Sequence, residues 1–354
     1  MKPARSVLPT TPSLKRGYLT RRRVVLVLAG LAVVLLFATL VALALGPEPI
    51  PLRVLGNGIA AKFMGAASPL TLEQEAILFQ VRWPRIMLAL AVGAAFALAG
   101  AALQALLRNP LADPHVLGVS SGAALGAIMG IVCAEQLALD PRWSRSLLGF
   151  GGALLTSAIV YRLGRREADP ARLVLAGVIV SVFLSSLNVL VLSLVDDVRL
   201  RSITLWLLGD LSGGTVENLF FVLPVVLLSL GVLTMQARAL NLLMIGERDA
   251  FALGVETARV RWVIFAAASL LTGAAVSSSG SIGYVGLLTP HLMRLAAGAD
   301  NRLVIPASAL AGALLTLLAD TLARTLIAPR ELPTGAITAL LGAPVFIYLL
   351  LRNR

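Results

Sequence analysis

Residues that carry charge or bind metals are scarce in this chain. Charged residues make up 14% of its 354 positions, and it has one cysteine and two histidines. Its lysines are Lys2, Lys15 and Lys62, and because none follows a glycine, the chain has no P-loop of the Gly-Lys-Ser/Thr type. We therefore do not expect it to bind ATP through such a loop.

Catalytic and metal-binding patterns are also missing from the sequence. Cys133 lies in an apolar stretch with no second cysteine to pair with, so we interpret it as a small core residue. His115 and His291 lie outside any His-Glu-x-x-His pattern, and we interpret both as structural. Without paired carboxylates, a histidine cluster or a nucleophile beside a base, we predict no enzyme and no metal or cofactor site.

Long apolar runs are abundant, by contrast. Hydrophobic residues make up 58% of the chain and the mean hydropathy is +0.89, far above that of a soluble domain. Runs of about 17 to 25 residues recur, and each can cross about 30 Å of hydrocarbon as a helix. The sequence predicts an all-α polytopic membrane protein with about ten spans, at 24–45, 86–107, 116–134, 147–161, 173–195, 218–237, 262–276, 284–297, 303–322 and 334–351.

The basic residues predict how these spans are oriented. With the N-terminus in the cytoplasm, 20 of the 30 Lys and Arg residues lie inside, but only 7 of the 18 Asp and Glu residues do. This positive-inside bias explains the net charge of +12 without nucleic acid and places both termini in the cytoplasm. Because the first run exceeds the apolar core of a signal peptide, we expect it to be retained. We predict a basic tail, 1–23, and one permease domain, 24–354, with the segments 46–85 and 196–217 outside and a short helix around 205–208.

Three features within the spans leave alternatives open. Asp320 lies four residues before Arg324 on one helical face, which favours a local ion pair over a proton-coupling role. Glycines recur every fourth position in the third span, at Gly118, Gly122, Gly126 and Gly130, and favour close helix packing over a sliding surface. The serine- and glycine-rich segment 277–286 either lines a pathway or forms a tight turn.

The cytoplasmic segment 246–255, GERDAFALGV, has the pattern of a short helix. Glu247 and Asp249 would lie in its first turn, and Gly254 would end it. Its apolar residues Ala250, Phe251 and Leu253 would share one side. The residues alone are compatible with a solvated loop or with a helix that inserts Phe251 into a groove on another protein.

Three separated blocks of the sequence resemble one family of transporters. RWPRIMLALAVGAAFALAGAALQALLRNPLADPHVLGVSSGAALGA, at 82–127, is similar to the signature of the FecCD-type permeases, which serve importers of iron-siderophores, haem and cobalamin. GSIGYVGLLTPHLMRL from Gly280 and ELPTGAITALLGAPVFIYLLL from Glu331 resemble the C-terminal half of the same family. Only the basic tail departs from the family pattern.

The resemblance implies a type II ABC importer permease fold in a bacterial inner membrane. Its partners would be a second copy of the chain, two cytosolic ATPase subunits that bind ATP and Mg²⁺, and one periplasmic binding protein. The cargo would be an iron chelate, with haem the first choice, a ferric siderophore the second and cobalamin the third. The alternative is an ion-coupled secondary transporter or channel without an ATPase, for which the spans offer no ionisable relay or filter.

The resemblance also assigns roles to individual residues. Those implied to face acidic groups of the binding protein are Arg82, Arg85 and Arg324. The segment 246–255 resembles the coupling helix that enters a cleft of the ATPase, through Gly246, Glu247, Arg248, Asp249, Ala250, Phe251, Leu253 and Gly254. A gate at the cytoplasmic mouth is implied for the turn Arg108, Asn109, Pro110 and Leu111.

Overall fold

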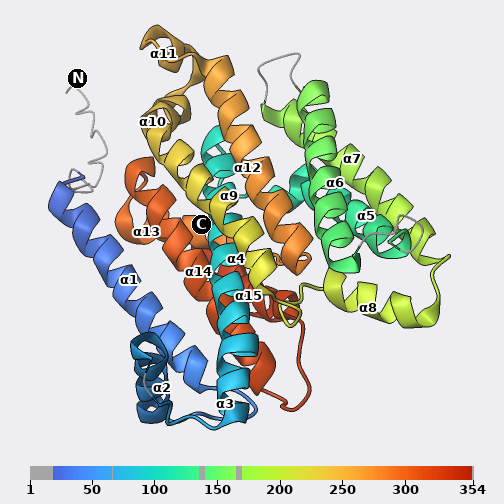
Figure 1. The fold of residues 1–354 in the computed structure, drawn as a ribbon. Helices are drawn as coiled ribbons and strands as arrows, with labels where there is room; N and C mark the ends of the chain where they lie inside the picture. The colour runs from blue at the N-terminus through green and yellow to red at the C-terminus, as the bar shows by residue number, and fades with distance from the viewer. Residues whose placement is uncertain (1–18, 66, 135–139, 165–169, 353–354) are drawn as a thin grey trace, which may run out of the picture.

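The computed structural model describes residues 19–65, 67–134, 140–164 and 170–352, and all regular structure in these ranges is helical (Figure 1). Most of the predicted tail, 1–18, lies outside the described residues. The helices are α1 (Arg21–Ala44), α2 (Leu52–Met64), α3 (Leu72–Ala76), the π-helical η1 (Ile77–Arg82), α4 (Trp83–Leu106), the 3-10 turn η2 (Pro114–Leu117), α5 (Val119–Val132), α6 (Pro141–Gly164), α7 (Pro170–Leu192), α8 (Asp197–Leu207), α9 (Val216–Met235), α10 (Ala237–Ile245), α11 (Glu247–Ala252), α12 (Thr257–Ser279), α13 (Val285–Ala297), α14 (Asn301–Thr325) and α15 (Thr334–Arg352).

Seven of the described helices are long and apolar enough to cross a membrane. They are α1, the continuous helix Leu72–Leu106, α6, α7, α9, α12 and α14. The three other predicted spans correspond to α5, α13 and α15, which form where the sequence predicts helices. Helices α5 and α13 are shorter, at 14 and 13 residues, and α15 is apolar over Thr334–Tyr348. The all-helical membrane fold is therefore confirmed, and the count of ten spans stays a prediction.

Two boundaries differ from those that the sequence predicts. The second span begins at Leu72 rather than at 86, because Thr71 and Gln74 form a capping box and the helix continues through η1 for 35 residues. Charged residues within it, at Arg82 and Arg85, led the sequence analysis to start the span too late. The short outer helix is also longer than predicted: α8 begins after Asp196, whose side chain accepts a hydrogen bond from the Arg199 amide at 3.0 Å.

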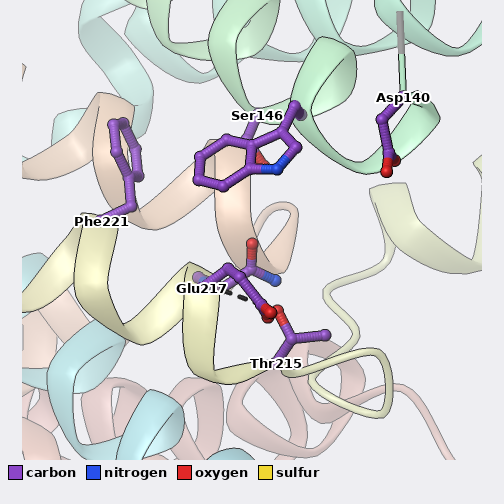
Figure 2. A pocket seen from close by; sticks show the side chains of 7 residues that line it. Asp140, Ser146, Thr215, Glu217 and Phe221 are labelled. Atoms are coloured by element: carbon purple, nitrogen blue, oxygen red, sulfur yellow. Dashed lines mark hydrogen bonds between the residues drawn. The ribbon is translucent and has the colours of Figure 1, made fainter.

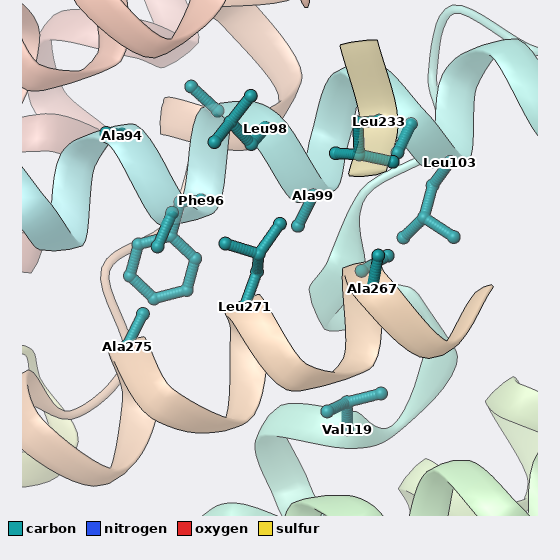
Figure 3. Close-up of a cluster of buried hydrophobic side chains, with 14 of the residues drawn as sticks. Ala94, Phe96, Leu98, Ala99, Leu103, Val119, Leu233, Ala267, Leu271 and Ala275 are labelled. Carbon is teal, nitrogen blue, oxygen red and sulfur yellow. The ribbon is translucent and has the colours of Figure 1, made fainter. Parts of the chain in front are cut away.

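Helix α4 forms the centre of the bundle. Almost all of its residues are buried, and its alanine-rich surface packs against α9, α12, α13 and α14. Figure 3 shows Phe96, Leu98 and Leu103 of α4 beside Leu271 of α12 and Leu233 of α9. Small residues allow the backbones to approach closely where lipid supplies no hydrophobic drive between helices.

Three of the four glycines of the third predicted span, Gly122, Gly126 and Gly130, pack against the neighbouring helix α6, as the packing interpretation predicts, whereas Gly118 approaches α7. A Cβ atom on Gly130 would lie 2.6 Å from the Ser144 carbonyl oxygen, and one on Gly126 would overlap the Leu148 carbonyl. The Ser144 hydroxyl also donates to the Gly130 carbonyl at 2.8 Å. Helices α5 and α6 are therefore in backbone contact along this ridge. Cys133, at the end of α5, is half-exposed and is not the buried core residue that we expected.

Candidate functional site

Arg82, Arg85 and Arg324 form one cluster, which we call the arginine cluster. Arg82 ends the π-helical turn η1, Arg85 follows in the first turn of α4, and Arg324 lies in the last turn of α14. All three are buried, with exposed fractions of 3%, 4% and 3%. The structure thus brings together the three arginines that the sequence predicted to act jointly, but it places them beneath the surface.

Each arginine has partners within the chain. Arg82 donates to the Leu43 carbonyl oxygen at 3.0 Å and to the Glu48 carbonyl, and Arg324 donates to the Ala42 carbonyl. The cluster therefore fastens the end of α1 to α4 and α14. Their role in docking a binding protein stays a prediction.

Asp320 holds Arg85 in a bidentate pair. Arg85 Nε lies 3.1 Å from Asp320 Oδ2 and its Nη2 lies 2.9 Å from Oδ1, while the Thr334 hydroxyl donates to Oδ1 at 3.1 Å. The sequence predicted that Asp320 pairs with Arg324. This prediction is wrong, because Asp320 pairs with Arg85. Because Asp320 is fully buried, its charge requires the closest available guanidinium, and that group comes from α4.

Glu331 completes this network and was missed by the sequence analysis. It lies in the segment between α14 and α15, and its Oε2 lies 2.8 Å from Arg85 Nη1. Its side chain is 39% exposed, whereas that of Arg85 is 5% exposed. Glu331 is therefore the member of the network that reaches the surface. Only its place at the start of the ELP block marked it in the sequence.

The segment 246–255, which we call the coupling segment, forms a helix as predicted. Glu247 and Asp249 lie in the first turn of α11, and Gly254 has a φ of +84°, which favours glycine after a helix end. Phe251 and Leu253 are 71% and 64% exposed, but Ala250 is fully buried. The expectation that all three apolar residues share one side is therefore wrong, because Ala250 packs on its own chain while Phe251 and Leu253 are exposed.

An ion pair fixes the coupling segment to the membrane helices. Glu247 Oε2 lies 2.6 Å from Arg261 Nη2 of α12. The exposed Phe251 and Leu253 are thus carried on a short helix that is anchored at its first residue. Within the described part of the chain, no residue covers these two side chains, as expected of anchors for a partner's groove.

The predicted gate turn lies beside the coupling segment. Arg108 shares an open hollow with Gly246, Glu247, Arg248 and Asp249. Arg108 adopts a φ of +52°, and the Asn109 side chain accepts a hydrogen bond from the Leu111 amide at 2.9 Å, which closes the turn. The structure therefore brings together two predicted sites that are far apart in the sequence.

The arginine cluster and the coupling segment lie at opposite ends of the molecule. In Figure 1, α11 projects from one end, while α2 and α3, which lead into the arginine cluster, lie at the other. This arrangement is the one that the predicted topology requires.

Other polar groups sit between these ends. His115 is half-buried: its Nδ1 lies 2.7 Å from the Ser120 hydroxyl and its Nε2 lies 3.2 Å from the Ile282 carbonyl oxygen. This ring ties η2 to the segment that follows α12, in keeping with a structural role. Ser277, Ser278 and Ser279 are buried in the last turn of α12, so only the residues from Gly280 onwards form the predicted turn.

A small pocket that the sequence analysis did not predict lies between the starts of α6 and α9 (Figure 2). Its volume is about 90 Å³, and it is lined by Asp140, Trp143, Ser146, Thr215, Glu217, Asn218 and Phe221. No sequence pattern links these two helix starts, which are some 75 positions apart. No three His, Cys, Asp or Glu side chains in the described ranges are grouped as ligands for a metal ion.

Comparison with known proteins agrees with this geometry. The model of the FecCD transport family matches residues 25–352. The hemin transport system permease protein HmuU of Yersinia pestis is 42% identical over 286 residues, covering 78% of this chain and 84% of HmuU. The vitamin B12 import system permease protein BtuC of Escherichia coli O9:H4 is 40% identical over 281 residues, covering 79% of this chain and 85% of BtuC.

A solved structure shares the architecture. It is described as an inward-facing conformation of a putative metal-chelate type ABC transporter, and it superimposes with a TM-score of 0.79 at 35% identity, covering 92% of this chain and 99% of that one. The family consists of transport permeases rather than enzymes, and its members work with ATPase and binding-protein partners. This chain therefore belongs to the FecCD transport family and is a multi-pass membrane permease of an ABC importer.

Proposed function

We propose that two copies of this chain form the membrane channel of an ATP-driven importer of haem. Two cytosolic ATPase subunits supply the nucleotide chemistry with bound ATP and Mg²⁺, and a periplasmic binding protein delivers the cargo. The chain itself makes and breaks no bond in the cargo and holds no cofactor. It lies in the bacterial inner membrane with both termini in the cytoplasm.

The exposed anchors of the coupling segment carry this proposal. Phe251 and Leu253 project from a helix whose first residue is held by Arg261, so movement of a bound partner is passed directly to α12. An ATPase cleft that closes around Phe251 pulls on the permease at this point. The absence of a P-loop from the sequence supports a separate subunit as the source of hydrolysis.

The binding protein docks at the opposite end, over the arginine cluster. Glu331 is the exposed member of that network, so the binding protein meets Glu331 first and reaches Arg85 through it. Carboxylates on the binding protein suit this site because arginine pairs with them in a bidentate geometry. The gate turn at Arg108 lies next to the coupling segment, where closure of the ATPases acts on it directly.

Haem is proposed as the cargo ahead of a ferric siderophore and of cobalamin. The choice of haem is supported by the similarity of this chain to a hemin transport permease over most of both chains. The binding protein selects the ligand, so the decisive measurement is the affinity of the cognate binding protein for haem, a ferric siderophore and cobalamin. Tighter binding of either of the last two would replace haem as the cargo.

Uptake into proteoliposomes tests the importer itself. Vesicles that contain the chain with its ATPase, supplied with loaded binding protein, are expected to accumulate cargo only when ATP is enclosed with the ATPase. Vesicles that lack the ATPase are the control. Uptake driven by an ion gradient without ATP would support a secondary transporter or channel and would contradict the proposal.

A further inference from the structure

Helix α10, which leads into the coupling segment, is hydrogen-bonded to the start of α14. We call the three residues involved, Asn241, Asp300 and Asn301, the polar joint. Asn241 of α10 donates from Nδ2 to Asp300 Oδ1 at 2.8 Å. Its Oδ1 accepts two hydrogen bonds at 2.9 Å from Asn301, one from the backbone amide and one from the side chain. These three hydrogen bonds span about 60 positions of sequence and join two helices that are not consecutive.

The chemistry of the joint fixes the direction of each hydrogen bond. Hydrogen bonds from the Arg302 side chain, and one from Asn241, lower the pKa of Asp300 to about 2. Asp300 is therefore ionised at neutral pH and can only accept. The amide nitrogen of Asn241 must then face Asp300, and its oxygen faces Asn301, so the assignment of the amide is determined by the network.

The joint also supplies the N-terminal cap of α14. The first amides of a helix lack partners within it. Asp300 accepts from the Arg302 amide at 3.0 Å, and Asn241 takes the amide of Asn301, which is fully buried. The cap is thus shared between the helix's own residue and α10, and α10 cannot move away without leaving a buried donor unpaired.

Helix α14 runs from this joint to the arginine cluster. In the middle, the backbones of Gly312 and Gly93 of α4 are in direct contact. At the far end, Asp320 holds Arg85 and Thr334. One 25-residue helix therefore touches both functional ends of the molecule through buried polar contacts.

We propose that Asn241 is a positioning residue that transmits movement between the coupling segment and α14, and through α14 to the arginine cluster. The inference rests on the proposed importer function and adds the route by which the ATPase end and the binding-protein end influence each other. Asn241 belongs to neither the coupling segment nor the arginine cluster. It acts by holding α10, which leads directly into the coupling segment, on the end of α14.

The test uses the full complex in proteoliposomes and compares ATP hydrolysis with and without loaded binding protein. Asn241→Leu removes all three hydrogen bonds, and we expect stimulation by the binding protein to fall about fivefold or more, the range of typical coupling energies. Gln236→Leu, at the start of the same helix, is the matched control, because the described residues offer that amide no side-chain hydrogen bond. It should retain normal stimulation.

A pair of exchanges separates this role from simple folding. Asn241→Asp places a second carboxylate against Asp300 and should reduce stimulation. Combining it with Asp300→Asn reverses the donor and acceptor: the new amide at 300 donates to the new carboxylate at 241, which still accepts from Asn301. Because Asp300 Oδ1 also accepts from the Arg302 amide, Asp300→Asn is measured alone as well, so that its effect on the helix cap is known separately. We expect the double exchange to recover stimulation that Asn241→Asp loses.

The outcomes are distinct. Normal stimulation of Asn241→Leu would overturn the role of Asn241. So would a double exchange whose stimulation in assembled complexes is no higher than the two single exchanges, Asn241→Asp and Asp300→Asn, together predict. If Asn241→Leu does not assemble with the ATPase, the comparison of Asn241→Asp with the double exchange decides alone. Failure of the importer proposal appears differently, as absence of ATP-dependent uptake by the wild-type complex.

Discussion

Arg85 and Asp320 lie 235 positions apart in the chain, and their side chains form the buried charge pair of the arginine cluster. The sequence identified Asp320 as a charge within an apolar run, and it identified Arg85 through the resemblance of the 82–127 block to the family signature. It could not identify their pairing, because the i, i+4 neighbour Arg324 was a plausible local partner. Pairing across helices depends on the packing of α4 against α14, which no local pattern encodes.

Removal of Asp320 is expected to destabilise the protein strongly. Asp320→Ala leaves the Arg85 guanidinium buried without its bidentate partner, which costs about 3–5 kcal/mol. Glu331→Ala removes a partly exposed carboxylate from the same guanidinium and should cost about 0–1 kcal/mol. Denaturation of both variants in detergent measures the difference, and equal losses would contradict the importance of the buried pair.

Substitution of Phe251 tests whether the exposed side of the coupling segment links the permease to the ATPase. Phe251→Asp puts a charge where an apolar anchor is exposed, so the fold should be unaffected while ATP hydrolysis loses its link to uptake. The ratio of cargo imported to ATP hydrolysed should fall about tenfold, the effect of about 1.4 kcal/mol. Arg259→Ala, at an exposed position of α12 outside the coupling segment, is the control. An unaltered ratio in Phe251→Asp would remove the segment as a coupling element.

Single helices show where sequence patterns are sufficient. The coupling helix was predicted with its acidic first turn and terminal glycine, because these are local signals for helix ends. The start of the helix that contains α4 was not predicted correctly. Arg82 and Arg85 interrupt the apolar run, and the sequence does not show that both side chains have buried partners in the fold. The orientation of Ala250 was likewise unpredictable, since six residues are too few to define an apolar face.

The glycine ridge of α5 gives a prediction for helix packing. Gly126→Ala places a methyl group on the Leu148 carbonyl, so α5 and α6 must separate, and we expect a loss of about 1–3 kcal/mol. Gly151→Ala on α6 meets nothing within 4 Å and should be neutral or stabilise by up to about 1 kcal/mol. Thermal unfolding of the two variants in the same detergent makes the comparison. Similar melting temperatures would mean that the ridge does not limit the approach of the helices.

In the whole molecule, the arginine cluster and the coupling segment lie at opposite ends of the bundle (Figure 1). The sequence predicted this separation from the distribution of basic residues, which is a property of the entire chain and tolerates errors in single boundaries. It did not predict the contact between the gate turn at Arg108 and the coupling segment, or the pocket between α6 and α9. Both arise from tertiary packing between segments with no shared pattern.

Labelling of intact cells tests the orientation. In a Cys133→Ser background, Leu72→Cys, where the native side chain is 89% exposed, should react with a membrane-impermeant thiol reagent added from outside. Phe251→Cys should react only after the inner membrane is permeabilised. Reaction of both residues from the same side would contradict the importer topology.

The half-exposed position of Glu331 has a consequence for how tightly any acidic partner can hold Arg85. The guanidinium is already neutralised from two directions, so an arriving carboxylate substitutes for Glu331 instead of meeting an unsatisfied cation. Such an exchange keeps the number of ion pairs constant, and its free energy is the small difference between two similar contacts. A delivery protein held in this way leaves as readily as it arrives, which suits a transporter that must discharge its carrier in every cycle.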